Sequence, residues 1–170
     1  MQKSLGKLYQ IYTDGSSDNN VKPDLRIAAT GFCLVDENGV YDEGGKLHAC
    51  MESNCAELQA CIDGIEHLEE NYTIENIDNI LILSDSKYLV NSINVWIYKW
   101  RRQKFLQDNL YHGKIKRSNY DQITEISNYM YKYKIRSKYV KGHDYNQFNE
   151  YVHDIAYNKR KNKLEELNYD

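Results

Sequence analysis

The sequence predicts an α/β protein in which helices cover the faces of a mixed β-sheet. Three strand-like segments follow one another within the first 50 residues, and beyond them strand-like segments alternate with helical ones. No repeat, low-complexity tract or Pro/Gly/Ser-rich linker divides the 170 residues. We therefore expect a single domain over 1–170, with a core at about 8–157, a short N-terminal extension and a C-terminal helical tail.

The first part of the chain predicts an antiparallel arrangement of strands. Leu8 to Thr13 and Ala29 to Asp36 are rich in apolar and β-branched residues. Asn38-Gly39 follows the second segment and is the typical two-residue turn of a hairpin. A third strand is therefore expected from about Val40 to Cys50.

Hydrophobic periodicity predicts the first helix. Apolar side chains recur at three- and four-residue spacing, while acidic ones lie elsewhere around the wheel. The apolar positions are Leu58, Cys61, Ile62, Ile65 and Leu68. Asn54-Cys55-Ala56-Glu57 has the pattern of an N-cap followed by Glu three residues later, so we expect this helix to open at Asn54.

The second half predicts strands and helices in alternation. Ile80 to Ser84 is a short apolar run bounded by polar residues, which is typical of a strand buried on both faces. The expected elements after it are a helix from Ser86 to about Lys99, a helix near Tyr120 to Tyr131, a strand from Ile135 to Lys141 and a helix from about Asn149 to Lys163.

Composition excludes several classes of protein. Mean hydropathy is −0.77 and no apolar run approaches 18 residues, so we expect no membrane association. Met1 to Gln10 lacks the apolar region of a secretory signal. The four cysteines contain no C-x-x-C pair, which fits reduced thiols. We expect a cytoplasmic protein that is a monomer.

The net charge of −3 conceals two charged regions of opposite sign. From Asp36 to Asp85 there are 13 acidic residues and one Lys, and from Trp96 to Arg117 there are seven Lys or Arg and one Asp. The acidic region is suited to cations and the basic region to phosphates. Two ordinary solvated faces would produce the same pattern.

Three acidic residues are candidate metal ligands. Asp14 and Asp85 come at or near the ends of predicted strands, and Glu57 lies in the first turn of the first helix. Ligands collect at the carboxyl ends of strands in α/β sheets, and clustered carboxylates stay ionised when a divalent cation such as Mg²⁺ or Mn²⁺ binds them. Each residue also has a structural alternative: a turn at Asp14, a capping partner at Glu57 and an N-cap at Asp85.

Six segments in register carry a family resemblance. They are Tyr12-Thr13-Asp14-Gly15-Ser16, Asn54-Cys55-Ala56-Glu57-Leu58, Leu83-Ser84-Asp85-Ser86-Lys87-Tyr88-Leu89-Val90, Trp96-Ile97-Tyr98-Lys99-Trp100-Arg101-Arg102, Val140-Lys141-Gly142-His143, and Asn149-Glu150 followed by Ala156. In order and spacing the sequence resembles type 1 ribonuclease H, over some nine-tenths of the chain.

This resemblance implies a five-stranded mixed sheet in the order 3-2-1-4-5, with three antiparallel and then parallel strands. It implies an endonuclease that cuts the RNA strand of RNA/DNA hybrids with two Mg²⁺ ions, Mn²⁺ being a possible substitute, and leaves 5′-phosphate and 3′-hydroxyl ends. By position, Asp14, Glu57 and Asp85 carry over as metal ligands, and His143 as the histidine that assists proton transfer or product release.

The fourth metal ligand is ambiguous in this sequence. Counting without a gap places His153 where the family has a carboxylate, and Asp154 follows one residue later. Neighbours on a helix differ by about 100° in direction, so the two side chains point to different places. A hard cation prefers a carboxylate, and we therefore expect Asp154, with His153 as the alternative.

The resemblance also implies a substrate-binding surface. Trp96 to Phe105 is similar to the basic protrusion of cellular members, although at least one of its tryptophans is expected to pack the helix instead. The expected substrate-binding residues are Ser16, Asn19, Asn54, Ser86, Trp96, Trp100, Arg101, Arg102 and Lys104. The arginines and Lys104 would contact DNA phosphates, and the asparagines, with Asn20 as an alternative to Asn19, would reach the minor groove, where 2′-hydroxyls distinguish RNA.

Other functions remain as alternatives. A catalytically weakened, hybrid-binding domain of the same fold would explain the unusual fourth position. A resolvase or integrase-type nuclease would share the acidic cluster but lack the Trp-Lys-Trp and Val-Lys-Gly-His segments. A flavodoxin-like or phosphatase-like protein would need a phosphate-binding glycine loop or a nucleophile elbow, and the sequence has no such motif.

Overall fold

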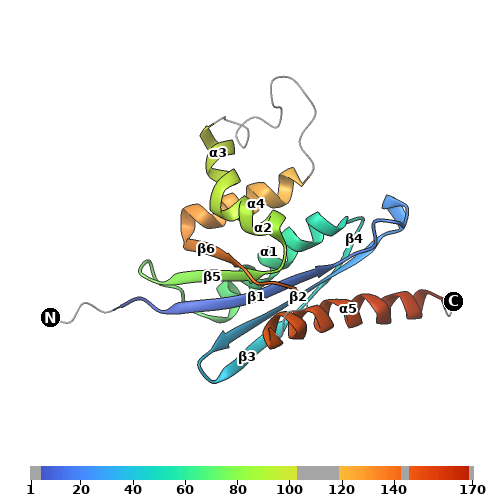
Figure 1. The fold of residues 1–170 in the computed structure, drawn as a ribbon, viewed down its shortest axis with the longest axis horizontal. Coiled ribbons are helices and arrows are strands. Elements are labelled where there is room, and N and C mark those ends of the chain that lie inside the picture. Colours follow the sequence, from blue (N-terminus) through green and yellow to red (C-terminus); the bar gives the residue numbers. More distant parts are fainter. Residues whose placement is uncertain (1–4, 103–118, 143–145, 169–170) are drawn as a thin grey trace.

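The computed structural model describes residues 5–102, 119–142 and 146–168. A mixed sheet forms its centre (Figure 1). The strands are β1 (Leu8–Ser16), β2 (Ile27–Asp36), β3 (Gly39–Gly44), β4 (Leu47–Ala49), β5 (Asn79–Ser84) and β6 (Lys134–Tyr139). Their order is β3-β2-β1-β5-β6, and β4 also pairs with β2. β1, β2 and β3 are antiparallel, whereas β5 and β6 run parallel to β1, which confirms the expected topology.

The expected third strand is divided in two. β3 ends at Gly44 and β4 begins at Leu47, and both pair with β2. Between them the chain passes close to Thr30, whose backbone N–H donates to the Lys46 carbonyl at 2.9 Å. A Cβ atom on Gly45 would lie 2.2 Å from the Thr30 carbonyl oxygen. The interruption therefore needs glycine at this position.

Helices cover both faces of the sheet (Figure 1). They are α1 (Ser53–Asn71), α2 (Lys87–Asn91), the π-helical segment η2 (Ser92–Trp96), α3 (Ile97–Arg102), α4 (Tyr120–Lys132) and α5 (Gln147–Asn168), with a short 3₁₀ turn η1 at Pro23–Leu25. The larger core packs α1, α4 and the segment from α2 to α3 against one face. α5 covers the other face, where Val152 packs with Tyr12 and Cys33. No helix in the described ranges is long and apolar enough to cross a membrane.

The start of α1 differs from the expectation. The helix begins at Ser53 with Glu52 as its N-cap residue, so the predicted cap at Asn54 was wrong. The Glu52 side chain makes no capping bond. Instead the Asn19 Oδ1 atom accepts hydrogen bonds from the Ser53 N–H at 2.9 Å and the Ser53 hydroxyl at 3.2 Å. A side chain distant in sequence thus satisfies an open donor of the first turn, which local pattern cannot reveal.

Candidate active site

Three carboxylates meet at the carboxyl ends of the neighbouring strands β1 and β5. Asp14, Glu57 and Asp85 each offer an oxygen atom, and these atoms lie within 4.8 Å of one another. The parallel register aligns Tyr12 of β1 with Leu83 of β5, so the residues two positions further on, Asp14 and Asp85, come side by side. The topology of the sheet therefore brings the two aspartates together.

Glu57 reaches the aspartates because α1 lies directly against β1. A Cβ atom on Gly15 would lie 2.4 Å from the backbone carbon of Ala56, so only glycine permits this approach. The Gly15 N–H then donates to Glu57 Oε2 at 3.2 Å. Asp14 itself continues the strand, paired with Gly31 of β2, which excludes a simple turn there.

The carboxylates disfavour one another's charge. Burial and the neighbouring Asp85 raise the pKa of Asp14 to about 6, although the hydrogen bond with His153 acts in the opposite direction. Burial, Asp14 and Asp85 raise the pKa of Glu57 well above its ordinary value. A divalent cation between these oxygens would favour the ionised forms. The donor set therefore fits a hard metal ion.

His153 joins the cluster, whereas Asp154 does not. The His153 Nδ1 atom lies 2.9 Å from Asp14 Oδ2. His153 also lines a cavity of about 250 Å³ together with the three carboxylates, Asn149 and Glu150. Asp154 is exposed and is absent from the residues that line this cavity. Counting without a gap had placed His153 at this position, and His153 is the residue that faces the site. The preference for a carboxylate had favoured Asp154, which does not face it.

Asn149 is a site residue that the sequence reasoning passed over. Its side chain is buried, with 4% of the residue exposed, and its Nδ2 atom donates to Asp85 Oδ2 at 3.3 Å. The Asn149 Oδ1 atom is buried without a hydrogen-bond partner among the described residues. A buried acceptor beside the carboxylates is suited to a ligand that brings a donor or a cation. Asn149 stood in the sequence within the Asn149-Glu150 segment, but that segment was used only to count positions along the family pattern.

Several expected substrate-binding side chains are engaged within the protein. The Ser16 hydroxyl accepts from Arg160 Nε at 2.9 Å, and the Ser86 hydroxyl accepts from the Leu89 N–H at 3.1 Å as the N-cap of α2. Asn19 caps α1, as described above. Asn54 is exposed and remains available to a ligand.

The basic segment divides into packing and exposed residues. Trp100 is buried in the larger core, and Trp96 is half-buried between Tyr88 and Trp100. Arg101 donates from Nε to the Ser127 hydroxyl at 2.8 Å and so ties α3 to α4. Arg102 is exposed. Lys104 and His143 lie outside the described residues.

A family model and a named relative match this chain. The model of the family described as RNase H matches residues 6–161. This chain belongs to the RNase H family. A protein named Ribonuclease H from Tropheryma whipplei (strain Twist) is 34% identical over 145 residues, which are 85% of this chain and 79% of the relative. As a member of the RNase H family the protein is a hydrolase of the ribonuclease H type, as the sequence predicted.

Solved structures share the RNase H fold with this chain. LC9-RNase H1, described as a type 1 RNase H with the type 2 active-site motif, matches with a TM-score of 0.74 at 17% identity, over 95% of this chain and 75% of that one. LC11-RNase H1 in complex with RNA/DNA hybrid matches with a TM-score of 0.61 at 15% identity, over 92% of this chain and 99% of that one. At these identities the likeness concerns the fold alone.

Proposed function

We propose that this protein hydrolyses the RNA strand of RNA/DNA hybrids and leaves 5′-phosphate and 3′-hydroxyl ends. The observation that carries the proposal is the convergence of Asp14, Glu57 and Asp85 in a member of the RNase H family. A solved structure of the same fold holds an RNA/DNA hybrid, which supports the same substrate here.

Asp14, Glu57 and Asp85 would hold two Mg²⁺ ions, with Mn²⁺ as a substitute. An all-oxygen donor set suits both metals. The chemistry that two bound ions supply is activation of a water nucleophile and neutralisation of charge on the departing 3′ oxygen.

The chain's own residues position these carboxylates. The Gly15 N–H fixes one oxygen of Glu57, and the Asn149 amide fixes one oxygen of Asp85. His153 does the same for Asp14, and we propose that it takes the fourth position of the site. Its side chain is 53% exposed, so it can meet both the cluster and a substrate. His143 stays our candidate for proton transfer, and Arg102 and Lys104 our candidates for phosphate contact.

Cleavage of a labelled RNA/DNA hybrid tests the proposal. We expect cleavage in Mg²⁺ and in Mn²⁺, none in EDTA, and none by Asp14→Asn or Asp85→Asn. Double-stranded DNA of the same sequence is the matched substrate control. Tight hybrid binding by the unmodified protein without cleavage in either metal would contradict the proposal and favour a hybrid-binding domain. The monomeric state and the cytoplasmic location stay predictions.

A further inference from the structure

The edge strand β6 carries a row of basic side chains. Lys134, Arg136 and Lys138 are exposed, while Ile135 and Ser137 between them are buried. Alternate residues of a strand project to the same side, at intervals of roughly 6.6 Å. Among the described strands β6 pairs with β5 alone, and the Asn94 side chain bonds both the N–H and the carbonyl of Ser137 in the middle of β6. We call Lys134, Arg136 and Lys138 the β6 basic row.

The charges of this row are not neutralised within the part of the chain that the structure describes. None of the three forms an ion pair there, whereas Lys46 pairs with Glu66 and Lys132 with Glu69. Exposed basic side chains commonly have acidic neighbours on mixed surfaces. The row is instead a cationic surface without an internal counter-charge.

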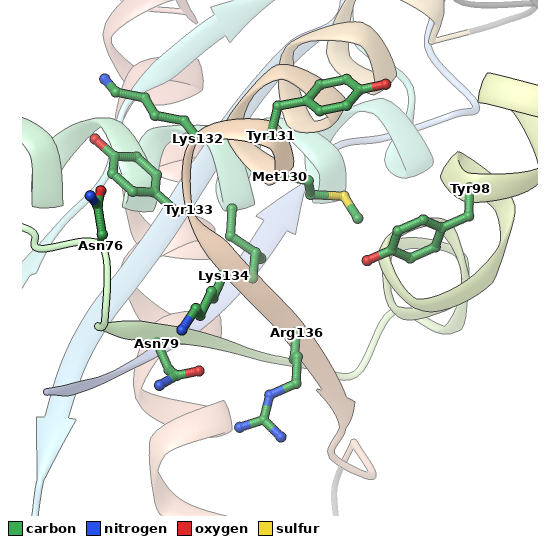
Figure 2. A pocket seen from close by; sticks show the side chains of 10 residues that line it. Asn76, Asn79, Tyr98, Met130, Tyr131, Lys132, Tyr133, Lys134 and Arg136 are labelled. Carbon is green, nitrogen blue, oxygen red and sulfur yellow. The ribbon is translucent and has the colours of Figure 1, made fainter. Parts of the chain in front are cut away.

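A groove runs beside the start of β6 (Figure 2). Its volume is about 610 Å³, and its lining includes Tyr98, Tyr131 and Tyr133 together with Lys134 and Arg136, with no Asp or Glu among the described residues that line it. In Figure 2, Tyr98 comes from α3 and Tyr131 from α4, while Lys134 and Arg136 come from β6. Aromatic and basic side chains therefore both line the groove.

The tyrosines are presented to solvent in a fixed arrangement. Tyr131 is 73% exposed and Tyr98 is 48% exposed, although both are large aromatic residues. The guanidinium of Arg101 lies 3.6 Å from the centre of the Tyr131 ring, and Ser127 holds that guanidinium in place. A ring that is ordered before a ligand arrives loses less conformational entropy when it binds one.

The row is continuous with the candidate active site. β5 and β6 are parallel, and their carboxyl ends lead to Asp85 and Gly142 respectively. A Cβ atom on Gly142 would lie 3.1 Å from Asp85 Oδ2, so the end of β6 approaches the cluster closely. A strand of nucleic acid that leaves the active site along β6 would meet Lys138, then Arg136, then the groove.

We propose that the groove and the β6 basic row bind a single strand of nucleic acid that continues from the hybrid. Phosphates would lie along Lys134, Arg136 and Lys138, and unstacked bases would lie against Tyr98 and Tyr131. A basic groove with aromatic side chains is the usual means of binding single strands, since every base has a face that stacks. This inference rests on the proposed function, because the strand is an extension of that substrate.

Binding to hybrids with and without a single-stranded overhang tests this inference. Kd is measured by fluorescence anisotropy in EDTA, where no cleavage occurs, for a blunt hybrid and for the same hybrid with a DNA overhang at either end. We expect one overhang to tighten binding about tenfold, as base stacking on one aromatic side chain does. The triple variant Lys134→Gln, Arg136→Gln, Lys138→Gln and the single variant Tyr98→Leu should each remove most of that gain.

The controls separate this site from general electrostatics and from the proposed function. Lys22→Gln, Lys161→Gln, Lys163→Gln removes the same charge elsewhere and should keep the overhang gain. Blunt-hybrid cleavage in Mg²⁺ should be unchanged in the β6 variants. Equal affinity for blunt and overhanging hybrids in the unmodified protein would overturn the inference. An acidic peptide that displaces the overhanging hybrid equally well from the unmodified protein and from Tyr98→Leu would also overturn it, since the groove would then be a protein-binding site. Failure of blunt cleavage with an intact overhang gain would contradict only the proposed function.

Discussion

Two neighbouring side chains of α5 point in different directions at the active site. His153 faces Asp14, whereas Asp154 points to solvent. Adjacent positions on a helix diverge by about 100°, so a one-residue difference in register decides which group reaches the cluster. The chemical preference of Mg²⁺ for carboxylates favoured Asp154 in the sequence, but the orientation of the helix puts His153 at the cluster.

Replacing each neighbour in turn measures this difference. We expect His153→Ala to lower the rate of hybrid cleavage by about 10- to 100-fold, the usual cost of losing a group that supports metal ligands. Asp154→Ala should change the rate by less than about twofold, because an exposed side chain outside the cavity is lost. Titrations of Mg²⁺ and Mn²⁺ at fixed substrate give both rate and apparent metal affinity. An inert His153→Ala would contradict the proposed fourth position.

Asp14 should make the metal-free protein less stable than its amide analogue. Its pKa rises from 3.8 to about 6 on folding, so ionisation of this carboxyl destabilises the folded state increasingly as the pH rises above about 4. Asp14→Asn should therefore raise stability by about 1–3 kcal/mol at pH 7 in EDTA, and the gain should vanish below about pH 4.

Urea unfolding at pH 7 and pH 4 measures that effect. Added Mg²⁺ should stabilise the unmodified protein and act weakly on Asp14→Asn, because binding to the folded state alone raises stability. A lower midpoint for Asp14→Asn in EDTA at pH 7 would show that the contact with His153 outweighs the repulsion.

At the scale of elements, a buried carboxylate joins three segments on the α1 side of the sheet. Asp63 of α1 accepts hydrogen bonds from Thr30 of β2 at 2.6 Å and Gln59 at 3.0 Å, and its other partner is His48 of β4 at 2.8 Å. Burial would raise the pKa of Asp63, but the bonds from His48, Thr30 and Gln59 outweigh burial and lower it. This network fixes the short strand β4 against the helix.

A carboxylate with a lowered pKa stabilises the fold above its unfolded pKa and loses that effect as the pH falls through its folded pKa. Asp63 should therefore contribute at neutral pH and fail below about pH 4. Asp63→Asn should cost about 2–4 kcal/mol at pH 7, since buried partners lose a charged acceptor. Thermal unfolding across pH 3–8 checks this, with the exposed Asp154→Asn as control. A pH-independent difference between Asp63→Asn and the unmodified protein would contradict it.

Strands and helices were predictable from periodicity, but their interruptions were not. The presence of the strands and of α1, α4 and α5 follows from patterns of two and of three to four residues, whereas the order of the strands in the sheet was implied by the family resemblance. The break at Gly45 depends on the carbonyl of Thr30, which lies 15 positions away in the sequence. The cap of α1 by Asn19 likewise depends on a distant segment. Local pattern carries no information about such contacts.

The same division holds for the site. Asp14, Glu57 and Asp85 were predictable because each is fixed by its own strand or helix. Asn149 and the internal use of Ser16 by Arg160 were not, because both depend on how α5 lies across the sheet. Side chains whose role arises from packing between elements become visible only in the folded chain.

For the whole molecule, the net charge of −3 is a poor guide to affinity for nucleic acid. Basic side chains gather at the end of α3, apart from the acidic cluster. We expect the Kd for a hybrid to weaken steeply with salt, by about 10²-fold or more between 50 and 200 mM if at least four phosphates are contacted. Anisotropy with the inactive Asp85→Asn variant measures the slope. A salt-independent Kd would contradict binding through phosphates.

The groups at the active site come from almost the full length of the chain. Asp14 and His153 are 139 positions apart, and Asn149 comes from the same late helix. During synthesis a ribosome releases β1, α1 and β5 long before α5. A nascent chain thus holds all three carboxylates without the residues that orient two of them. The proposed hybrid cleavage should then appear only after the ribosome has released α5 and this helix has packed on the sheet.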